Sequence, residues 1–153
     1  MSKLILTIDR FLEGRRCRQS LWRSLHTEQS STSPILDDSL TSLITHAVNW
    51  FEDSSSLEIM PQFDTPLGIA SPHIIDKSDS EWDLYIVKPT VSCKYSHYNE
   101  MAFHYTLLTY HDYPIRDCYV LHLNSDYLYS PPLNYTHLFK CISSCRLCRC
   151  VSH

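Results

Sequence analysis

The order of strand and helix patterns between residues 82 and 123 constrains the fold of this chain more than any other feature. Residues 82–88 (WDLYIVK) and 117–123 (DCYVLHL) are short runs rich in β-branched and aromatic residues, and Pro89 ends the first, so both predict strands. Between them, residues 98–111 carry apolar side chains at helical spacing and predict a helix. Strand, helix and strand in this order predict a mixed α/β protein.

The first half of the chain predicts two helices followed by short strands. The helices cover about residues 7–25, where a threonine can cap the first turn and Gly14 can divide the segment into two helices, and about residues 38–52. Strands are predicted over residues 57–63 and 67–75, the second weakened by Pro72, which cannot donate to a β ladder. Helices, strands, a helix and a strand therefore make up one compact domain.

Composition excludes several classes of protein. The 153 residues include only two glycines, so glycine-rich phosphate-binding loops are excluded, and no apolar run is long enough to span a membrane. The N-terminus carries too short an apolar block for a signal peptide. Seven cysteines, an odd number, without such a signal favour free thiols or a metal site in the reducing cytoplasm over a disulfide framework.

A local basic segment stands out against a formal net charge of −4. Five arginines lie within 14 residues, between positions 10 and 23. A basic helix face of this kind can bind nucleic-acid phosphates, and the alternative is a solvated helix face without a ligand. The candidate nucleic-acid-binding residues are Arg15, Arg16, Arg18 and Arg23.

Three blocks of the chain resemble the RecB-like nucleases of the PD-(D/E)XK superfamily, in a bacterial subgroup related to CRISPR-associated exonucleases. Residues 7–22 (TIDRFLEGRRCRQSLW) resemble the opening helix with its cysteine, basic pair and Leu-Trp. Residues 82–90 (WDLYIVKPT) are similar to the strand that ends in Glu-Val-Lys in those enzymes, and residues 98–105 and 120–127 to the helix and strand that follow it. The resemblance implies a restriction-endonuclease-like core, with a mixed central β-sheet flanked by helices.

The resemblance also implies a reaction, which is metal-dependent hydrolysis of DNA. Two acidic side chains of the family hold Mg²⁺ or Mn²⁺, and a lysine contacts the attacking water or the phosphate. Lys88 stands at the lysine position, but Ile86 replaces the glutamate two residues earlier, and the expected aspartate falls near Ser71 or Pro72. Isoleucine cannot bind a metal, so hydrolysis is expected to be weakened or lost.

Other acidic residues are candidates to replace the missing ligands. Asp76 would take the aspartate's role if the register were shifted, and Glu100 would supply a carboxylate from the helix, where it shares a face with His104 at i and i+4. The candidate catalytic residues are therefore Lys88, Glu100 and His104, with Asp76 and Glu100 as metal ligands. The alternative is a surface lysine and an ordinary exposed helix pair.

The C-terminal residues are rich in cysteine. With one N-terminal cysteine they echo related nucleases that hold a 4Fe–4S cluster, and thiolates also bind zinc. The alternative is free thiols on a frayed tail. The composition changes after Phe139, which predicts a nuclease-like domain over residues 1–139 and a cysteine-rich tail over 140–153. The candidate cluster or zinc ligands are Cys17, Cys141, Cys145 and Cys148.

Three functions stay open at this point. The first is a Mg²⁺-dependent deoxyribonuclease with weakened activity, the second a non-catalytic module that binds nucleic acid or protein, and the third a truncated remnant without function. The remaining histidines are scattered, and His122 in a strand is expected to be a packed core residue. The oligomeric state and the choice between DNA and RNA are not determined by the sequence.

Overall fold

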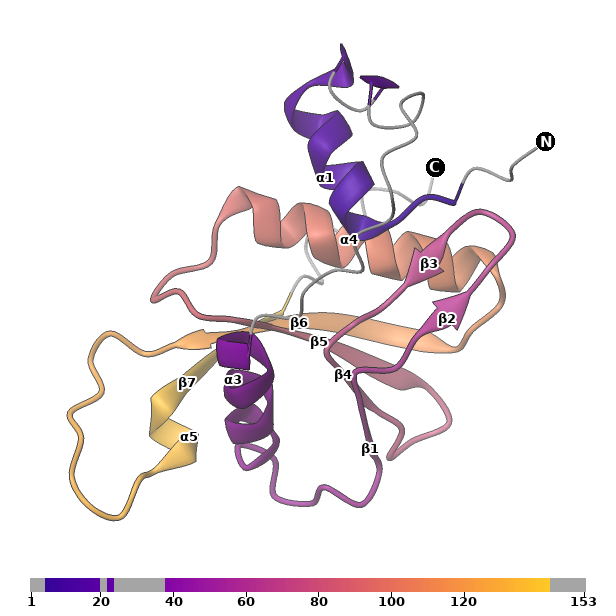
Figure 1. Ribbon diagram of the computed structural model, residues 1–153. Helices are drawn as coiled ribbons and strands as arrows, with labels where there is room; N and C mark the ends of the chain where they lie inside the picture. Colours follow the sequence, from indigo (N-terminus) through magenta and orange to yellow (C-terminus); the bar gives the residue numbers. More distant parts are fainter. Residues whose placement is uncertain (1–4, 20–21, 24–37, 144–153) are drawn as a thin grey trace.

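The computed structural model describes residues 5–19, 22–23 and 38–143 of the chain (Figure 1). Within these ranges no helix is both long and apolar enough to cross a membrane. The chain order of the elements is α1 (Ile8–Arg16), α3 (Asp38–Val48), β1 (Leu57–Ile59), β2 (Phe63–Asp64), β3 (Ile69–Ala70), β4 (Ile74–Asp76), β5 (Trp82–Lys88), α4 (Tyr95–Tyr110), β6 (Ile115–Leu123), α5 (Tyr135–Leu138) and β7 (Phe139–Ser143).

Five of these strands form one mixed sheet, in the order β1-β4-β5-β6-β7. β5 and β6 run parallel and are joined by α4, because parallel neighbours need a long crossover connection. The other neighbouring pairs are antiparallel, and β2 and β3 form a separate two-stranded sheet. This mixed sheet with flanking helices confirms the predicted α/β class and is compatible with a restriction-endonuclease-like core.

The side chains of β5 alternate between the two faces of the sheet. Leu84 and Ile86 belong to the core that packs against α4 and α1, whereas Tyr85 and Val87 belong to the core on the α3 side. Figure 1 shows α4, with α1 beyond it, on one side of the sheet and α3 on the other. Lys88 has the parity of Ile86, so its side chain lies on the α4 side.

Helix α1 begins where the sequence predicts and ends earlier. The Thr7 hydroxyl accepts a hydrogen bond from the Arg10 N–H (3.4 Å), and Asp9 lies in the first turn, where the helix dipole favours negative charge. Gly14 lies inside the helix and does not break it; the backbone turns extended at Cys17. The predicted helical segment over 7–25 is therefore interrupted at Cys17 and not at Gly14, and the described residues 18–19 and 22–23 are helical again.

The strands predicted over 57–63 and 67–75 are each divided in two. Met60 adopts a positive φ of 50° between β1 and β2, and Pro72 separates β3 from β4. Each predicted segment contributes one piece to the central sheet and one to the small sheet. Met60, in the left-handed region, and Pro72 each interrupt the pairing of a strand. The pattern of apolar residues alone does not show these interruptions.

β7 extends the sheet beyond the predicted domain. It pairs antiparallel with β6, with Leu121 opposite Cys141, so the boundary predicted between residues 139 and 140 falls inside this strand. Residues 144–153 of the predicted tail lie outside the described residues. The short helix α5 precedes β7, and the Asn134 side chain caps it by accepting from the His137 N–H (3.2 Å).

Gly68 joins the N-terminal segment to the rest of the fold. Leu6 forms a parallel bridge with Gly68, and the Ile69 N–H donates to the Leu6 carbonyl (2.9 Å). A Cβ atom on Gly68 would overlap the Leu6 carbonyl oxygen. This contact lies just before Ile8, the first residue of α1, and so sets where the arginines of that helix are placed.

Replacing Gly68 by alanine should lower the free energy of unfolding by about 1–3 kcal/mol, because the overlapping group is backbone and cannot rotate aside. Urea unfolding measures the change. Gly14→Ala, inside α1, is the matched control and should stabilise the protein by up to about 1 kcal/mol through helix propensity. Equal stability of the Gly68→Ala variant and the wild type would contradict the proposed docking of the N-terminal segment.

Candidate active site

Lys88 and Glu100 form an ion pair between the end of β5 and the second turn of α4. The Lys88 ammonium contacts Glu100 Oε2, and the two side chains are only 18% and 9% exposed. The pair lies at the carboxyl ends of the parallel strands β5 and β6, the edge of an α/β sheet where ligand sites commonly form. The structure therefore brings together two of the three predicted catalytic residues in a largely buried position.

Four histidines surround this pair. His122 lies opposite Lys88 in the register of β5 and β6, and His73 immediately precedes β4 with the parity of the α4 side. His97 and His104 lie three residues before and four residues after Glu100, so all three share one face of α4. His104, the third predicted catalytic residue, is thus part of the same cluster.

Backbone N–H groups determine the proton positions on three of these imidazoles. Nδ1 of His73 accepts from the Val87 N–H (2.9 Å), Nδ1 of His97 from the Lys94 N–H (3.1 Å) and Nδ1 of His104 from the Ser71 N–H (3.3 Å). A neutral imidazole that accepts at Nδ1 carries its proton at Nε2. The Nε2 atom of His104 is buried and has no hydrogen-bond partner in the described part of the chain.

Burial keeps these three histidines neutral. Desolvation, reinforced by the Lys88 charge, lowers the pKa of His73 and of His97 to about 4. Desolvation, with smaller effects of His73 and Lys88, lowers the pKa of His104 to about 3. At neutral pH they are uncharged hydrogen-bonding groups around one ammonium ion, and a general acid that donates a proton at pH 7 is not among them.

Among the described residues, the carboxylates needed for Mg²⁺ or Mn²⁺ do not converge on Lys88. In the register of β4 and β5, Asp76 lies opposite Asp83, which precedes Lys88 by five residues, or about 16 Å along β5. The Asp76 carboxylate accepts hydrogen bonds from the Ser56 hydroxyl and the Ser78 N–H. In the ranges that the structure describes, no three His, Cys, Asp or Glu side chains are placed to hold a metal ion. Glu100 alone, already paired with Lys88, does not provide the oxygen ligands that these ions take.

Ile86, which stands at the position of the family's glutamate, is a core residue. Its side chain is 1% exposed and packs in the core beneath α4. Lys88 lies two residues further along the same face of β5 and forms an ion pair with Glu100 on α4. The carboxylate that contacts Lys88 is therefore that of Glu100 on the helix, and the role of Glu100 as a metal ligand stays a prediction.

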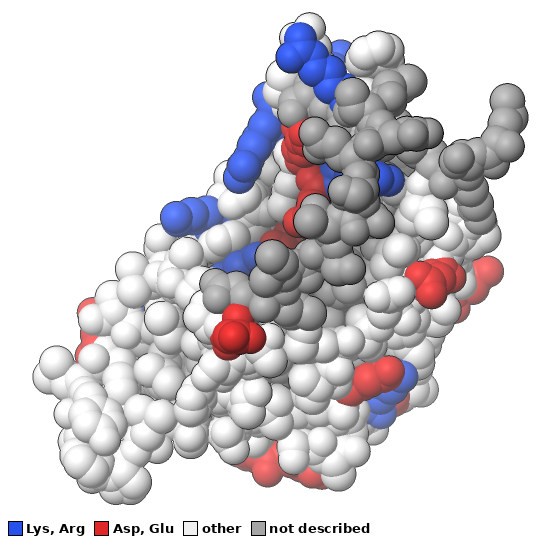
Figure 2. Space-filling model, in the orientation of Figure 1, with Lys and Arg blue, Asp and Glu red and all other residues white. Residues whose placement is uncertain are grey.

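The arginines of α1 lie near this end of α4. Arg15 and Arg16 occupy the last turn of α1, where positive charge stabilises the helix dipole, and Arg15 Nη2 donates to the Tyr95 hydroxyl (3.2 Å). Arg16, Arg18 and Arg23 are exposed. Most of the lysine and arginine side chains visible in Figure 2 lie over α1 and the adjoining part of the molecule.

The structure separates two of the predicted cluster ligands. Cys17 follows α1, on the α4 side of the sheet, whereas Cys141 has the parity of Phe139, which packs on the α3 side. Cys141 is exposed, and partial desolvation with the nearby Asp117 and Asp83 charges raises the pKa of its thiol to about 11. Cys145 and Cys148 lie outside the described residues.

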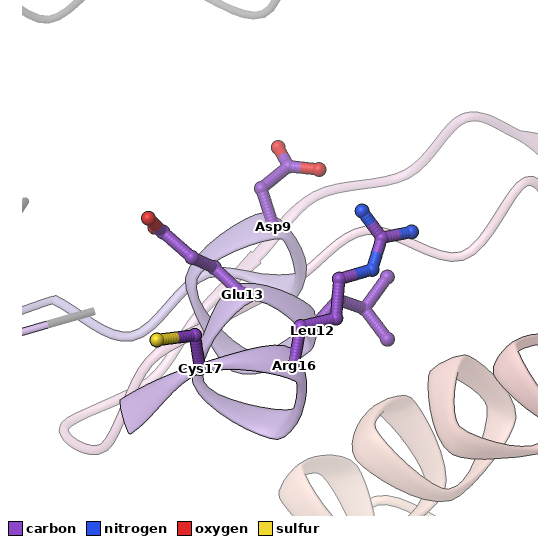
Figure 3. Close-up of a pocket in the computed structure, with 5 residues that line it drawn as sticks. All are labelled: Asp9, Leu12, Glu13, Arg16 and Cys17. Carbon is purple, nitrogen blue, oxygen red and sulfur yellow. The ribbon is translucent and has the colours of Figure 1, made fainter. Parts of the chain in front are cut away.

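Cys17 lines an open cavity of about 450 Å³ along α1. Figure 3 shows the Asp9, Glu13 and Cys17 side chains along one side of the helix, with Arg16 and Leu12 on the other. Asp9, Glu13 and Cys17 are spaced by four residues, so helical periodicity alone places them together. Their alignment is the surface pattern of a helix and not a set of convergent metal ligands.

Sequence reasoning missed three members of the site, His73, His97 and His122. His97 could have been recognised, because it lies on the same helix face as Glu100 and His104. His73 lies just before β4 and His122 lies in β6, and no spacing in the sequence connects them with Lys88.

No family model, no curated protein and no solved structure matches this chain.

Proposed function

We propose that this chain is a PD-(D/E)XK nuclease-like protein that binds DNA and in which metal-dependent phosphodiester hydrolysis is lost or residual. The observation that carries this proposal is the Lys88–Glu100 pair, set between a parallel strand and the helix that follows it. A lysine at this place would act on phosphate or water in the family, but here its charge is neutralised by Glu100. A metal site that would restore hydrolysis is not supported by the described carboxylates.

The position of the arginines supports the binding function. The last turn of α1 lies against the first turn of α4, through the Arg15–Tyr95 hydrogen bond, so the basic segment is adjacent to the helix that carries Glu100. Exposed arginines are the residue type that phosphate binding needs. In the described part of the chain Cys17, Cys93 and Cys141 are free thiols, which supports a reducing, cytoplasmic setting.

A cleavage assay tests the catalytic half of the proposal. Incubation of the purified chain with single- and double-stranded DNA and Mn²⁺ or Mg²⁺ should leave the DNA uncut or nearly so. Lys77→Ala is the control for Lys88→Ala, since Lys77 forms an exposed pair with Glu58. Cleavage that is retained in the control and lost in Lys88→Ala would show instead that the chain is an active nuclease.

A binding assay tests the other half. Replacing Arg16 and Arg18 by alanine should weaken DNA binding about tenfold and reduce the slope of log affinity against log salt by about 2, because two phosphate contacts are lost. The variant Lys77→Ala/Lys140→Ala removes the same charge from exposed pairs elsewhere and should bind like the wild type. Equal weakening by both variants would show that only the net charge of the protein affects DNA binding. Absence of all binding would refute the proposal.

A further inference from the structure

Tyr95 is an exposed aromatic side chain inside the proposed DNA-binding surface. It is the first residue of α4 and is 71% exposed. Arg15 contacts its hydroxyl, at the edge of the ring, so this contact leaves the ring faces open. A large ring this exposed buries little apolar area in the fold, so its faces are available to a ligand.

The surroundings of Tyr95 carry positive charge. Arg15 lies on α1 beside it, and Lys94 precedes it at the N-cap of α4 and is exposed. The first turn of α4 contains no acidic residue, and Glu100 in the next turn is already paired with Lys88. An exposed ring that contacts Arg15 and directly follows Lys94 suits a nucleic-acid strand, whose phosphates pair with the cations while a base stacks on the ring.

We infer that Tyr95 is a stacking platform that gives this surface a preference for single-stranded over double-stranded DNA. The inference rests on the proposed DNA-binding function and adds its substrate class. In a duplex the bases are stacked on each other and present only their edges, so an aromatic side chain gains nothing from them without unstacking. In a single strand each base has a free face, and stacking on tyrosine adds to the phosphate contacts.

The chain offers a matched control for this residue. Tyr110, the last residue of α4, is 70% exposed, so the two tyrosines differ in their position along one helix and not in exposure. Tyr95→Phe keeps the ring and removes the hydroxyl that contacts Arg15. Comparison of Tyr95→Ala, Tyr95→Phe and Tyr110→Ala therefore separates stacking from the hydrogen bond and from general surface change.

The experiment measures affinities of the full chain by fluorescence anisotropy for a labelled oligo-dT strand, a duplex and a strand of abasic sites. Tyr95→Ala should weaken binding to oligo-dT about 5- to 100-fold and change binding to the other two probes by less than about twofold. Tyr95→Phe and Tyr110→Ala should bind oligo-dT like the wild type.

Two results would overturn the inference alone. One is unchanged binding of oligo-dT by Tyr95→Ala, and the other is an equal loss on all three probes, which would indicate a structural or electrostatic effect. Failure of the wild type to bind any of the probes would overturn the proposed function as well. Circular dichroism spectra of the variants that match the wild type exclude unfolding as the cause of a loss.

Discussion

Replacing Glu100 by glutamine should lower the free energy of unfolding by about 3 kcal/mol. The change leaves the Lys88 ammonium, only 18% exposed, without its carboxylate among neutral histidines, and breaking a buried ion pair by removing one partner typically costs about 3–5 kcal/mol. The lower end applies because Lys88 retains some access to water. Urea unfolding measures the loss, and a cost below about 1 kcal/mol would contradict the buried character of the pair.

Two further variants distinguish the cost of leaving Lys88 unpaired from the contribution of the ion pair as a whole. Lys88→Met/Glu100→Leu removes both charges and should recover most of the stability lost in Glu100→Gln, because burying two ions costs about as much as their attraction returns. Glu58→Gln breaks the Lys77–Glu58 pair, whose side chains are 35% and 46% exposed, and should cost less than about 1 kcal/mol. A double variant no more stable than Glu100→Gln would show that the pair determines the packing of α4 on the sheet.

Acidification from pH 6.5 to 4 should destabilise the protein steeply. In the folded state the pKa of His73 and of His97 is lowered to about 4 and that of His104 to about 3, below the ordinary 6.5 of an unfolded histidine. Below pH 6.5 the unfolded chain therefore binds protons that the folded chain does not. The stabilisation is fully present above pH 6.5 and is lost as the pH falls through this window, at up to about 1.4 kcal/mol per pH unit for each histidine.

The pH dependence has its own control pair. In His104→Asn the side-chain oxygen can still accept from the Ser71 N–H, but the titrating group is gone, so the slope of stability against pH should fall by about one proton. His137→Asn replaces an exposed histidine and should leave the slope unchanged. Stability that is constant between pH 6.5 and 4 would contradict the buried, neutral state of the cluster.

Local patterns predicted the elements that carry the site. β5 has the predicted bounds, and α4 and β6 each begin two or three residues earlier than predicted, because alternation and helical spacing are properties of neighbouring residues. The Thr7 cap and the shared helix face of Glu100 and His104 follow from the same short-range geometry. These features depend on contacts within a few residues, which a sequence shows directly.

Long-range register determined which of the candidates meet. The antiparallel pairing of β4 with β5 sets Asp76 opposite Asp83, far from Lys88, although Asp76 is an acidic residue in a neighbouring strand. The parallel pairing of β5 with β6 sets His122 beside Lys88 instead. A shift of register by one residue would reverse these faces, and no pattern in the single sequence specifies the register between strands separated by a whole helix.

Local patterns alone predict that Lys88 ends a strand, that Glu100 lies on the following helix, and that a basic segment occupies the first helix. The ion pair of Lys88 with Glu100, the three histidines around it that no local pattern predicted, and the contact of Arg15 with Tyr95 become apparent only in the folded chain. The physical reason is that charge and pKa depend on burial and on partners brought together from distant parts of the chain, whereas strand and helix formation depends on neighbouring residues.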